Sequence, residues 1–337
     1  MLLYDTDKSI RNNDFAIEIS KGLEAKMKYV SPKYFYDQVG SDLFEKISAQ
    51  PEYYLTRTES SILEKYNDDI YELCGRRDLS IVELGSGSSS KTRILLDKFL
   101  SEGARIFYFP IDVSESMLND SINSLFARYK NLRIVGVCSE FSNGAKRVND
   151  FISTHAEIPV RKLLLFLGSS IGNFEPLQVK NFLTELAGQM NIGDTMLIGF
   201  DLHKEKTYLE RAYNDEAGIT AKFNLNILAR INRELSGEFE LSQFKHEAFY
   251  NMDKNRIEMH LTSLCDQSIA IRELGKQFTF RKGERIHTEN SYKFSIDQIN
   301  SLATQSGLTV LKNYIDDDNL YCLTHLGYVF STPKTGK

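Results

Sequence analysis

The hydrophobic and polar positions between residues 57 and 201 follow a pattern that changes period several times. From Arg57 to Cys74 apolar residues recur at helical spacing, and Gly75 follows as a stop signal, which predicts an amphipathic helix. Short apolar runs then alternate with helical stretches, a pattern typical of parallel βαβ units. The predicted strands are 79–84, 105–111, 132–137, 162–167 and 195–201, and the predicted helices are 91–100, 115–129 and one after Pro176, a residue that suits a first helical turn. This segment therefore predicts a doubly wound α/β sheet.

The pattern is different on both sides of this segment. After Asp201 two helical segments, 204–213 and 218–235, precede strand-like runs at 244–251 and 256–265, which we interpret as an inserted second domain. Beyond Phe294 a helix to about Gln305 and strand-like runs at 309–315 and 321–330 would complete the sheet. The first 55 residues contain a helical stretch at 14–29 and an aromatic-rich passage at 34–41, whose fold the pattern does not define.

Length, composition and charge narrow the class of protein. With 337 residues, 42% of them hydrophobic and 26% charged, the chain is an ordinary globular protein of roughly two domains. Its 46 acidic and 41 basic residues give a formal net charge of −5, so no basic excess is available for binding nucleic acid. The most apolar stretch, Leu163 to Ile171, is far shorter than a membrane span, and residues 1–20 contain no continuous apolar run typical of a signal peptide.

The cysteines and histidines give no sign of a metal or disulfide site. Four widely spaced cysteines form no CxxC pair, which favours a reducing cytoplasm, and the six histidines show no metal-ligand spacing. We therefore expect a cytoplasmic protein without a metal, a membrane partner or a nucleic-acid partner, and nothing in the patterning demands an oligomer, so we expect a monomer.

The turn after the first strand has the composition of a cofactor site. Gly85 and Gly87 let the backbone approach a ligand closely, but Ser90 stands where a nicotinamide fingerprint requires a third glycine, and the phosphate-loop spacing is absent. The acidic Glu83 before the glycines and Asp112 at the end of the second strand suit a cofactor with a ribose diol and a cation. S-adenosylmethionine is such a cofactor, with its adenine placed against Glu140 and Phe141 after the third strand.

Longer motifs, in order along almost the whole chain, resemble the histidine-specific Nα-methyltransferases of ergothioneine biosynthesis. They are YFYDQVGSDLF at 34–44, PEYYLTRTE at 51–59, FLGSSIGNF at 166–174, RAYND at 211–215 with Phe223 and Asn224, RIEM at 256–259 and TENSYKF at 288–294. The resemblance implies a Rossmann-like methyltransferase sheet with a discontinuous α+β substrate-binding domain. The expected cofactor-binding domain comprises 57–203 plus 294–337, and the expected substrate-binding domain comprises 1–56 plus 204–293. Glu140 stands where the family more usually has aspartate.

The resemblance also implies the roles of particular residues. Tyr53, Asn173 and Tyr213 would hold the amino-acid backbone, and with Tyr36 they are our candidate catalytic residues. Glu289 and Ser291 would recognise the imidazole of L-histidine. The full substrate-binding set is Phe44, Tyr53, Gly168, Ser170, Asn173, Tyr213, Met259, Glu289 and Ser291, and the full cofactor-binding set is Tyr36, Glu83, Gly85, Gly87, Lys91, Asp112, Glu140 and Phe141. The implied reaction is three successive methyl transfers that give the betaine hercynine.

Three other functions remain open at this point. A methyltransferase of the same group acting on tryptophan or tyrosine is disfavoured by the polar pair Glu289 and Ser291, which suits an imidazole better than an indole or a phenol. A cofactor-binding protein without turnover is disfavoured because the backbone-holding residues are intact. A nicotinamide-dependent oxidoreductase is disfavoured by Ser90.

Overall fold

The computed structural model describes residues 2–4 and 8–328, which divide into two compact units. Unit 1 contains β1 (Leu2–Tyr4), Leu55–His203 and the described residues from Lys293 onwards. Unit 2 contains the other described residues up to Tyr54 together with Lys204–Tyr292. Within the described residues no helix combines the length and the apolar character that a membrane span needs.

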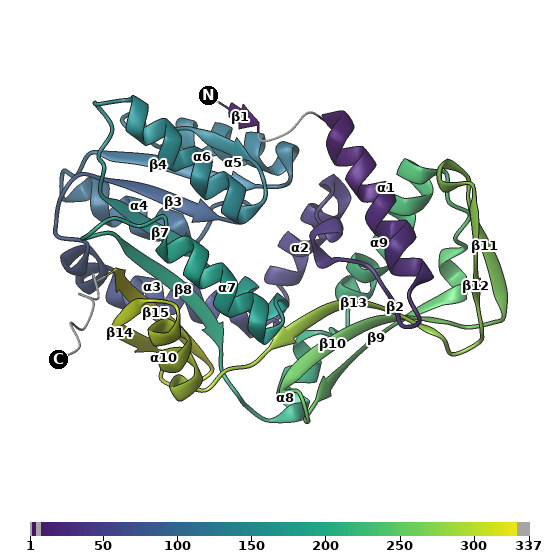
Figure 1. Ribbon diagram of the computed structural model, residues 1–337. Helices are drawn as coiled ribbons and strands as arrows, with labels where there is room; N and C mark the ends of the chain where they lie inside the picture. Colours follow the sequence, from purple (N-terminus) through teal and green to yellow (C-terminus); the bar gives the residue numbers. More distant parts are fainter. Residues whose placement is uncertain (1, 5–7, 329–337) are drawn as a thin grey trace, which may run out of the picture. The chain divides into compact units, whose positions relative to one another are not determined.

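Unit 1 is built on a mixed sheet, which has nine strands among the described residues. Its order is β1-β6-β4-β3-β7-β8-β15-β14, with the short β5 also paired to β4 (Figure 1). The neighbours from β1 to β8 are parallel, whereas β15 runs antiparallel to both β8 and β14. The strands are β3 (Leu79–Leu84), β4 (Ile106–Asp112), β5 (Arg133–Ile134), β6 (Gly136–Cys138), β7 (Lys162–Phe166), β8 (Thr195–Asp201), β14 (Leu308–Ile315) and β15 (Tyr321–Tyr328). Because helices cover both faces, β3, β7 and β8 are buried along their whole length.

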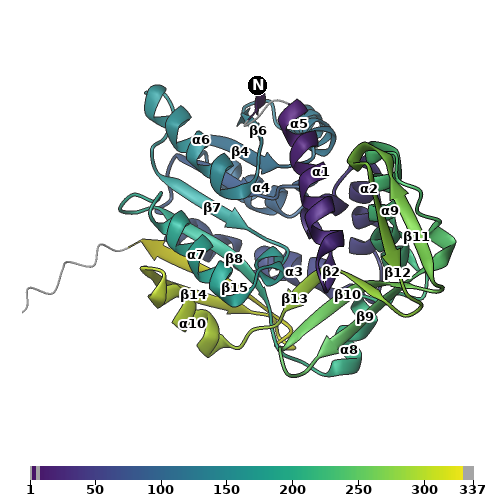
Figure 2. The same cartoon turned by 45° about the vertical axis from the view of Figure 1, so that its right-hand side comes forward.

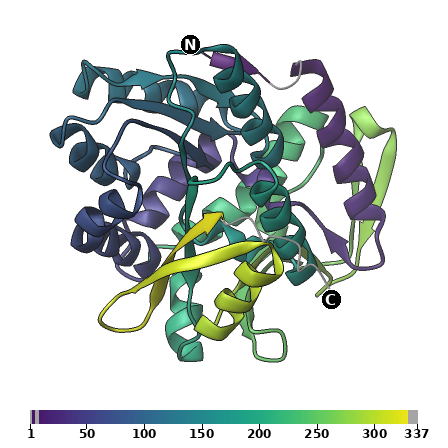
Figure 3. The same cartoon turned by 60° about the vertical axis from the view of Figure 1, so that its left-hand side comes forward.

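The helices of unit 1 begin at residues suited to starting a helix. Ser114 caps α5 by accepting from the Met117 amide, Ser295 and Gln298 form a capping box on α10, and Pro176 opens α7. The helices α6, α7 and α10 contact one another in a row that follows one face of the sheet (Figures 1 and 3). The helical elements are α3 (Tyr54–Leu73), α4 (Thr92–Ser101), α5 (Glu115–Arg128), α6 (Phe141–Thr154), the 3₁₀ turn η2 (Ser170–Asn173), α7 (Pro176–Ala187) and α10 (Ile296–Gln305).

Unit 2 combines a second sheet, of order β2-β13-β10-β9, with a separate hairpin, β11-β12 (Figure 2). Helix α9 contacts α2, β9 and β10 and so connects the early part of the unit to the inserted part. The helical elements are α1 (Lys8–Glu24), η1 (Pro32–Phe35), α2 (Gln38–Ser48), α8 (Lys206–Ala212), α9 (Ile219–Leu235), η3 (Leu241–Gln243) and η4 (Arg272–Leu274). The strands are β2 (Lys28–Tyr29), β9 (Phe244–Asn251), β10 (Arg256–Ser263), β11 (Gln267–Ile271), β12 (Lys276–Phe280) and β13 (Arg285–Tyr292).

The structure confirms the doubly wound α/β fold and corrects several expected details. The helix expected at 14–29 ends at Glu24, because the chain then pairs with β13 through Lys28 and Tyr29. The single strand expected at 132–137 is two short strands, β5 and β6. The first residues were expected to lie in the substrate domain, but β1 pairs in parallel with β6 in the sheet of unit 1. Of the last expected strand, 321–330, the final residues lie outside the described part of the chain.

A buried histidine on β15 makes the stability of unit 1 sensitive to acid. His325 has no exposed surface, and neither ring nitrogen has a hydrogen-bond partner among the described residues. Burial lowers its pKa from an ordinary 6.5 to about 4. The folded chain therefore keeps this ring neutral between these two pH values, whereas the unfolded chain takes up the proton.

We expect His325→Leu to flatten the acid side of the stability profile. Above pH 6.5 the ring is neutral in both the folded and the unfolded chain, but as pH falls towards 4 only the unfolded chain takes up the proton. His325 alone should therefore lower the unfolding free energy by about 2 kcal/mol between pH 7 and pH 5. Urea unfolding of both proteins at these two pH values measures this loss. A variant whose stability falls as steeply as that of the native chain would contradict the prediction.

Candidate functional site

The turn between β3 and α4 is held in a tight, left-handed conformation by the strand beside it. The amides of Gly85 and Ser86 both donate to the carbonyl oxygen of Ile111, at 2.8 and 3.1 Å. Gly85 and Gly87 have φ values of +71° and +49°, which residues other than glycine adopt only at an energetic cost. The predicted glycine loop is therefore formed by backbone geometry that favours glycine at both positions.

The carboxylate of Asp112 lies at the end of β4 and fixes the same loop. It accepts hydrogen bonds from the amides of Gly87 and Ser114, each at 2.9 Å. Burial raises its pKa even though these backbone amides favour the charged form. The residue is half-buried, so its carboxylate combines a fixed position with a surface that a ligand hydroxyl can reach.

Glu83 lies behind the loop rather than on its open side. One carboxylate oxygen accepts from the Thr92 hydroxyl at 2.6 Å and the other from the Tyr108 hydroxyl. Burial raises the pKa of Glu83 to about 7. Tyr108 also hydrogen-bonds to Ser89 at 2.8 Å, and Ser89 to Ser121 at 2.8 Å. These contacts place Glu83 in a buried network that supports the loop, a placement that the sequence did not indicate.

The open side of the loop fits an adenosyl cofactor. The buried hydroxyl of Ser86 has no hydrogen-bond partner among the described residues, and a side chain added at Gly87 would meet no atom within 4 Å. The ring of Phe141 lies against Gly85, where an added Cβ would come within 3.2 Å of it. Glu140 is the exposed N-cap of α6. An unused hydroxyl, open space and an aromatic face are what a ribose and an adenine require.

Lys91 and the segment after β7 share one partner that the sequence analysis did not assign. The Lys91 ammonium forms an ion pair with Glu59 of α3, and the amide of Gly168 donates to the same carboxylate at 2.8 and 3.0 Å. Gly168 opens the segment that contains Ser170 and, at the end of η2, the half-buried Asn173. Glu59 stands inside one of the family-like motifs, which was the only sequence signal for it.

Unit 2 gathers the residues expected to recognise the side chain of the substrate. Glu289 and Ser291 are two positions apart on β13 and therefore share a face of the sheet, and Glu289 is paired directly with Met259 of β10. The hydroxyl of Tyr213 donates to the Ser291 hydroxyl at 2.7 Å. Glu289, Ser291 and Tyr213 have 8%, 3% and 6% of their surfaces exposed, so all three polar side chains are buried.

A chain of aromatic rings joins the other expected substrate residues of unit 2. Tyr213 and Tyr53 lie 6.4 Å apart between ring centroids, Tyr53 and Phe44 6.1 Å, and Phe44 and Tyr36 5.7 Å. Phe223 of α9 contacts both Phe44 and Tyr36, at 6.0 and 5.8 Å, and was not among the expected site residues. Tyr36 is thus grouped with the substrate residues of unit 2, whereas the other seven expected cofactor residues lie in unit 1.

His246 is a second residue of this region that sequence reasoning missed. Its Nε2 hydrogen-bonds with the carbonyl oxygen of Tyr213 at 2.9 Å, so this nitrogen carries the proton, and Nδ1 accepts from the Asn224 amide at 2.8 Å. Burial lowers the pKa of His246, which keeps the ring neutral and both bonds intact. The backbone of Tyr213 is therefore fixed by a neutral imidazole.

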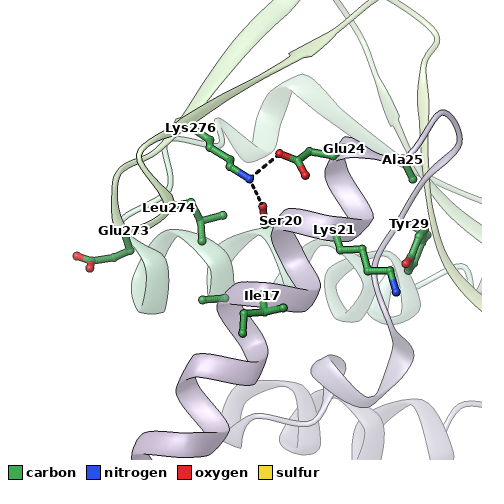
Figure 4. Close-up of a pocket in the computed structure, with 10 residues that line it drawn as sticks. Ile17, Ser20, Lys21, Glu24, Ala25, Tyr29, Glu273, Leu274 and Lys276 are labelled. Carbon is green, nitrogen blue, oxygen red and sulfur yellow. Dashed lines mark hydrogen bonds and ion pairs between the residues drawn. The ribbon is translucent and has the colours of Figure 1, made fainter.

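A shallow hollow of about 720 Å³ between α1 and the turn around η4 contains none of these residues (Figure 4). Lys276 crosses its rim and binds Glu24 and Ser20, at 2.6 and 2.8 Å. Within the described residues no three histidine, cysteine, aspartate or glutamate side chains gather as a metal site.

The sequence is similar to known methyltransferases along most of its length. The family described as histidine-specific methyltransferase, SAM-dependent, matches residues 15–327. A histidine N-alpha-methyltransferase of Mycolicibacterium smegmatis is 40% identical over 86% of this chain and 88% of its own length. A histidine N-alpha-methyltransferase of Mycobacterium tuberculosis is 39% identical over 89% of this chain and 90% of its own length. Among solved structures, the CcbJ methyltransferase of Streptomyces caelestis aligns with 88% of this chain and 98% of its own, at 12% identity and a TM-score of 0.45.

Proposed function

Because the chain belongs to the histidine-specific, S-adenosylmethionine-dependent methyltransferase family, we propose that it transfers methyl groups to the α-amine of L-histidine in ergothioneine biosynthesis. The observation that carries the assignment of histidine within the structure is the buried group Glu289, Ser291 and Tyr213. A carboxylate and a hydroxyl on one face of β13 supply an acceptor and a donor–acceptor, which match the two nitrogens of an imidazole. An indole or a phenol offers only one polar group and so matches this arrangement less well than an imidazole does.

The cofactor supplies an electrophilic methyl group on a sulfonium, and the residues of the chain bind and orient the reactants. In our proposal Asp112 accepts from the ribose hydroxyls, Phe141 faces the adenine and Lys91 belongs to the same cofactor set. Tyr53, Tyr213 and Asn173 hold the amino-acid backbone with neutral groups. Displacement at the methyl carbon requires an aligned, uncharged amine, so positioning is the main contribution of these residues to the rate.

The aromatic rings of unit 2 suit the proposed succession of three transfers. Each transfer adds a methyl group to the nitrogen, and the product is a permanent trimethylammonium cation. The rings of Tyr36, Phe44, Tyr53 and Phe223 lie in consecutive contact and offer faces that attract such a cation without a full negative charge. The proposed product is therefore the betaine, hercynine, rather than a singly methylated histidine.

We place this activity in a reducing cytoplasm and in a monomer. All four cysteines are free, and three of them, Cys74, Cys138 and Cys322, are buried, which supports a reducing compartment.

Mass spectrometry of the purified protein with S-adenosylmethionine and an equal mixture of the twenty amino acids tests the proposal. We expect histidine to gain one, two and finally three methyl groups while the other amino acids stay unchanged. Methylation of a different amino acid would overturn the roles of Glu289 and Ser291 but not that of the cofactor loop. A chain that binds S-adenosylmethionine and yields no methylated product would overturn the proposed activity itself.

A further inference from the structure

Glu59 is a buried carboxylate to which neither the proposed chemistry nor the sequence analysis gave a role. It lies on α3, with 0% of its surface exposed, and it contacts groups from three other parts of unit 1. The Lys91 ammonium pairs with Oε2, the Gly168 amide donates to both oxygens, and the Tyr321 hydroxyl of β15 donates to Oε1 at 2.7 Å. One carboxylate thus joins α3, the start of α4, the end of β7 and β15.

Two glycines leave the space that this carboxylate occupies. A Cβ at Gly199 of β8 would collide with both the Tyr321 hydroxyl and Oε1 of Glu59. A Cβ at Gly168 would come within 3.2 Å of the Lys91 ammonium, and φ at this glycine is +77°. The backbone of β8 and of the turn after β7 therefore accommodates Glu59, Tyr321 and Lys91 together.

The energetic cost of this arrangement points to a role beyond stability. Removing a carboxylate and an ammonium from water costs several kcal/mol per ion, and a well-packed apolar pair is often as stable. Glu59 is fully buried, and only 19% of the Lys91 side chain is exposed. Such a pair specifies geometry, because its charged hydrogen bonds tolerate few arrangements.

The groups that Glu59 holds lead directly to both sets of site residues in unit 1. Lys91 is the N-cap residue of α4, directly after the cofactor loop. Gly168 precedes Ser169, whose hydroxyl accepts from the Asp201 amide at 2.9 Å, and then Ser170 and Asn173. The position of Glu59 therefore bears on a cofactor residue and on the segment with the backbone-holding amide at the same time.

We propose that Glu59 is a positioning residue that fixes the Lys91 ammonium and the Gly168 amide relative to each other, and so sets the cofactor contact and the Ser170–Asn173 segment together. This inference rests on the proposed roles of Lys91 and Asn173. It assigns Glu59 no contact with the reacting atoms.

Calorimetric titration with S-adenosylhomocysteine tests the proposal with Glu59→Gln, Lys91→Met and the double variant. We expect Glu59→Gln alone to weaken binding by about tenfold, which corresponds to the loss of one charged hydrogen bond. In the Lys91→Met background the same change should alter affinity by no more than about twofold, or restore it, because the two residues act as one unit. The matched control is Glu64→Gln, an exposed glutamate on the same helix, which should bind as the native chain does.

Two outcomes of this cycle would overturn the proposal. One is a folded Glu59→Gln variant whose affinity and kcat match those of the native chain, and the other is a pair of effects that simply add, as expected from a purely structural role. If Glu59→Gln does not fold, Tyr321→Phe decides, because it removes one donor and keeps the ion pair. A loss of about threefold or more in affinity or kcat supports the proposal, and native values overturn it. The titration needs no amino acid, so failure of histidine methylation would be seen separately.

Discussion

Replacing Asp112 with alanine is expected to weaken S-adenosylmethionine binding at least about a hundredfold. The carboxylate holds the Gly87 and Ser114 amides, and in our proposal it also accepts from the ribose hydroxyls. Losing two charged hydrogen bonds to the ribose hydroxyls, of about 1.5–3 kcal/mol each, corresponds to that factor or more. Calorimetric titration of the variant with S-adenosylmethionine measures the loss directly.

The pH dependence of binding adds a second readout for Asp112. Only the ionised carboxylate accepts at both oxygens, so affinity should fall as pH falls through the pKa of this group. Because burial raises this pKa, the fall should begin at a higher pH than an ordinary aspartate would give. Asp120→Ala, on the exposed surface of α5, is the matched control. Native affinity in Asp112→Ala would remove Asp112 from the cofactor site.

Replacing Glu289 with alanine should reduce kcat/KM for histidine by about a hundredfold while the affinity for S-adenosylmethionine stays unchanged. In our proposal the variant leaves one nitrogen of the bound imidazole without its charged partner, and an unpaired buried polar group costs about 1–3 kcal/mol. The selectivity for histidine over phenylalanine and tryptophan should fall as well, because a smaller, less polar pocket wall accepts an indole or a phenyl ring more readily. Steady-state kinetics with histidine, phenylalanine and tryptophan measure both effects.

A control and a cofactor titration separate this effect from a general loss of structure. Glu45→Ala changes an exposed glutamate on α2 of the same unit and should leave all three kinetic ratios as they are. Equal losses for every amino acid, or unchanged kinetics with histidine, would show that Glu289 does not contact the imidazole.

The sheet of unit 1 was predictable because its signals are local and repeated. The strands 79–84 and 195–201 have the predicted bounds, since each is a short apolar run between helices or turns. Helices α4 and α5 begin and end within one residue of their predicted positions, because hydrophobic periodicity lies within one segment, whereas α6 was not predicted. The same local reasoning found the glycine loop and Asp112.

Other elements depended on partners far away in the sequence. Lys28 and Tyr29 are extended only because they pair with Ile286 and His287, about 260 residues later, and no local pattern contains that information. The hairpin β11-β12 was not predicted because its strands are short and partly exposed, whereas helix α2 was missed although its hydrophobic periodicity is strong. Strand β13, which bears Glu289 and Ser291, is defined by its pairing with β10.

The sequence by itself determined the fold class and the cofactor loop, because backbone conformation and hydrophobic period are properties of neighbouring residues, whereas the substrate set was implied only by the family resemblance. Only the tertiary structure decided which of these residues hold one another. It placed Glu83 in a network behind the loop, paired Lys91 with Glu59 and joined Tyr213 to Ser291. Such contacts depend on burial and on partners up to 262 residues apart, where a carboxylate or hydroxyl needs a hydrogen-bond partner and the folded chain alone determines which one is within reach.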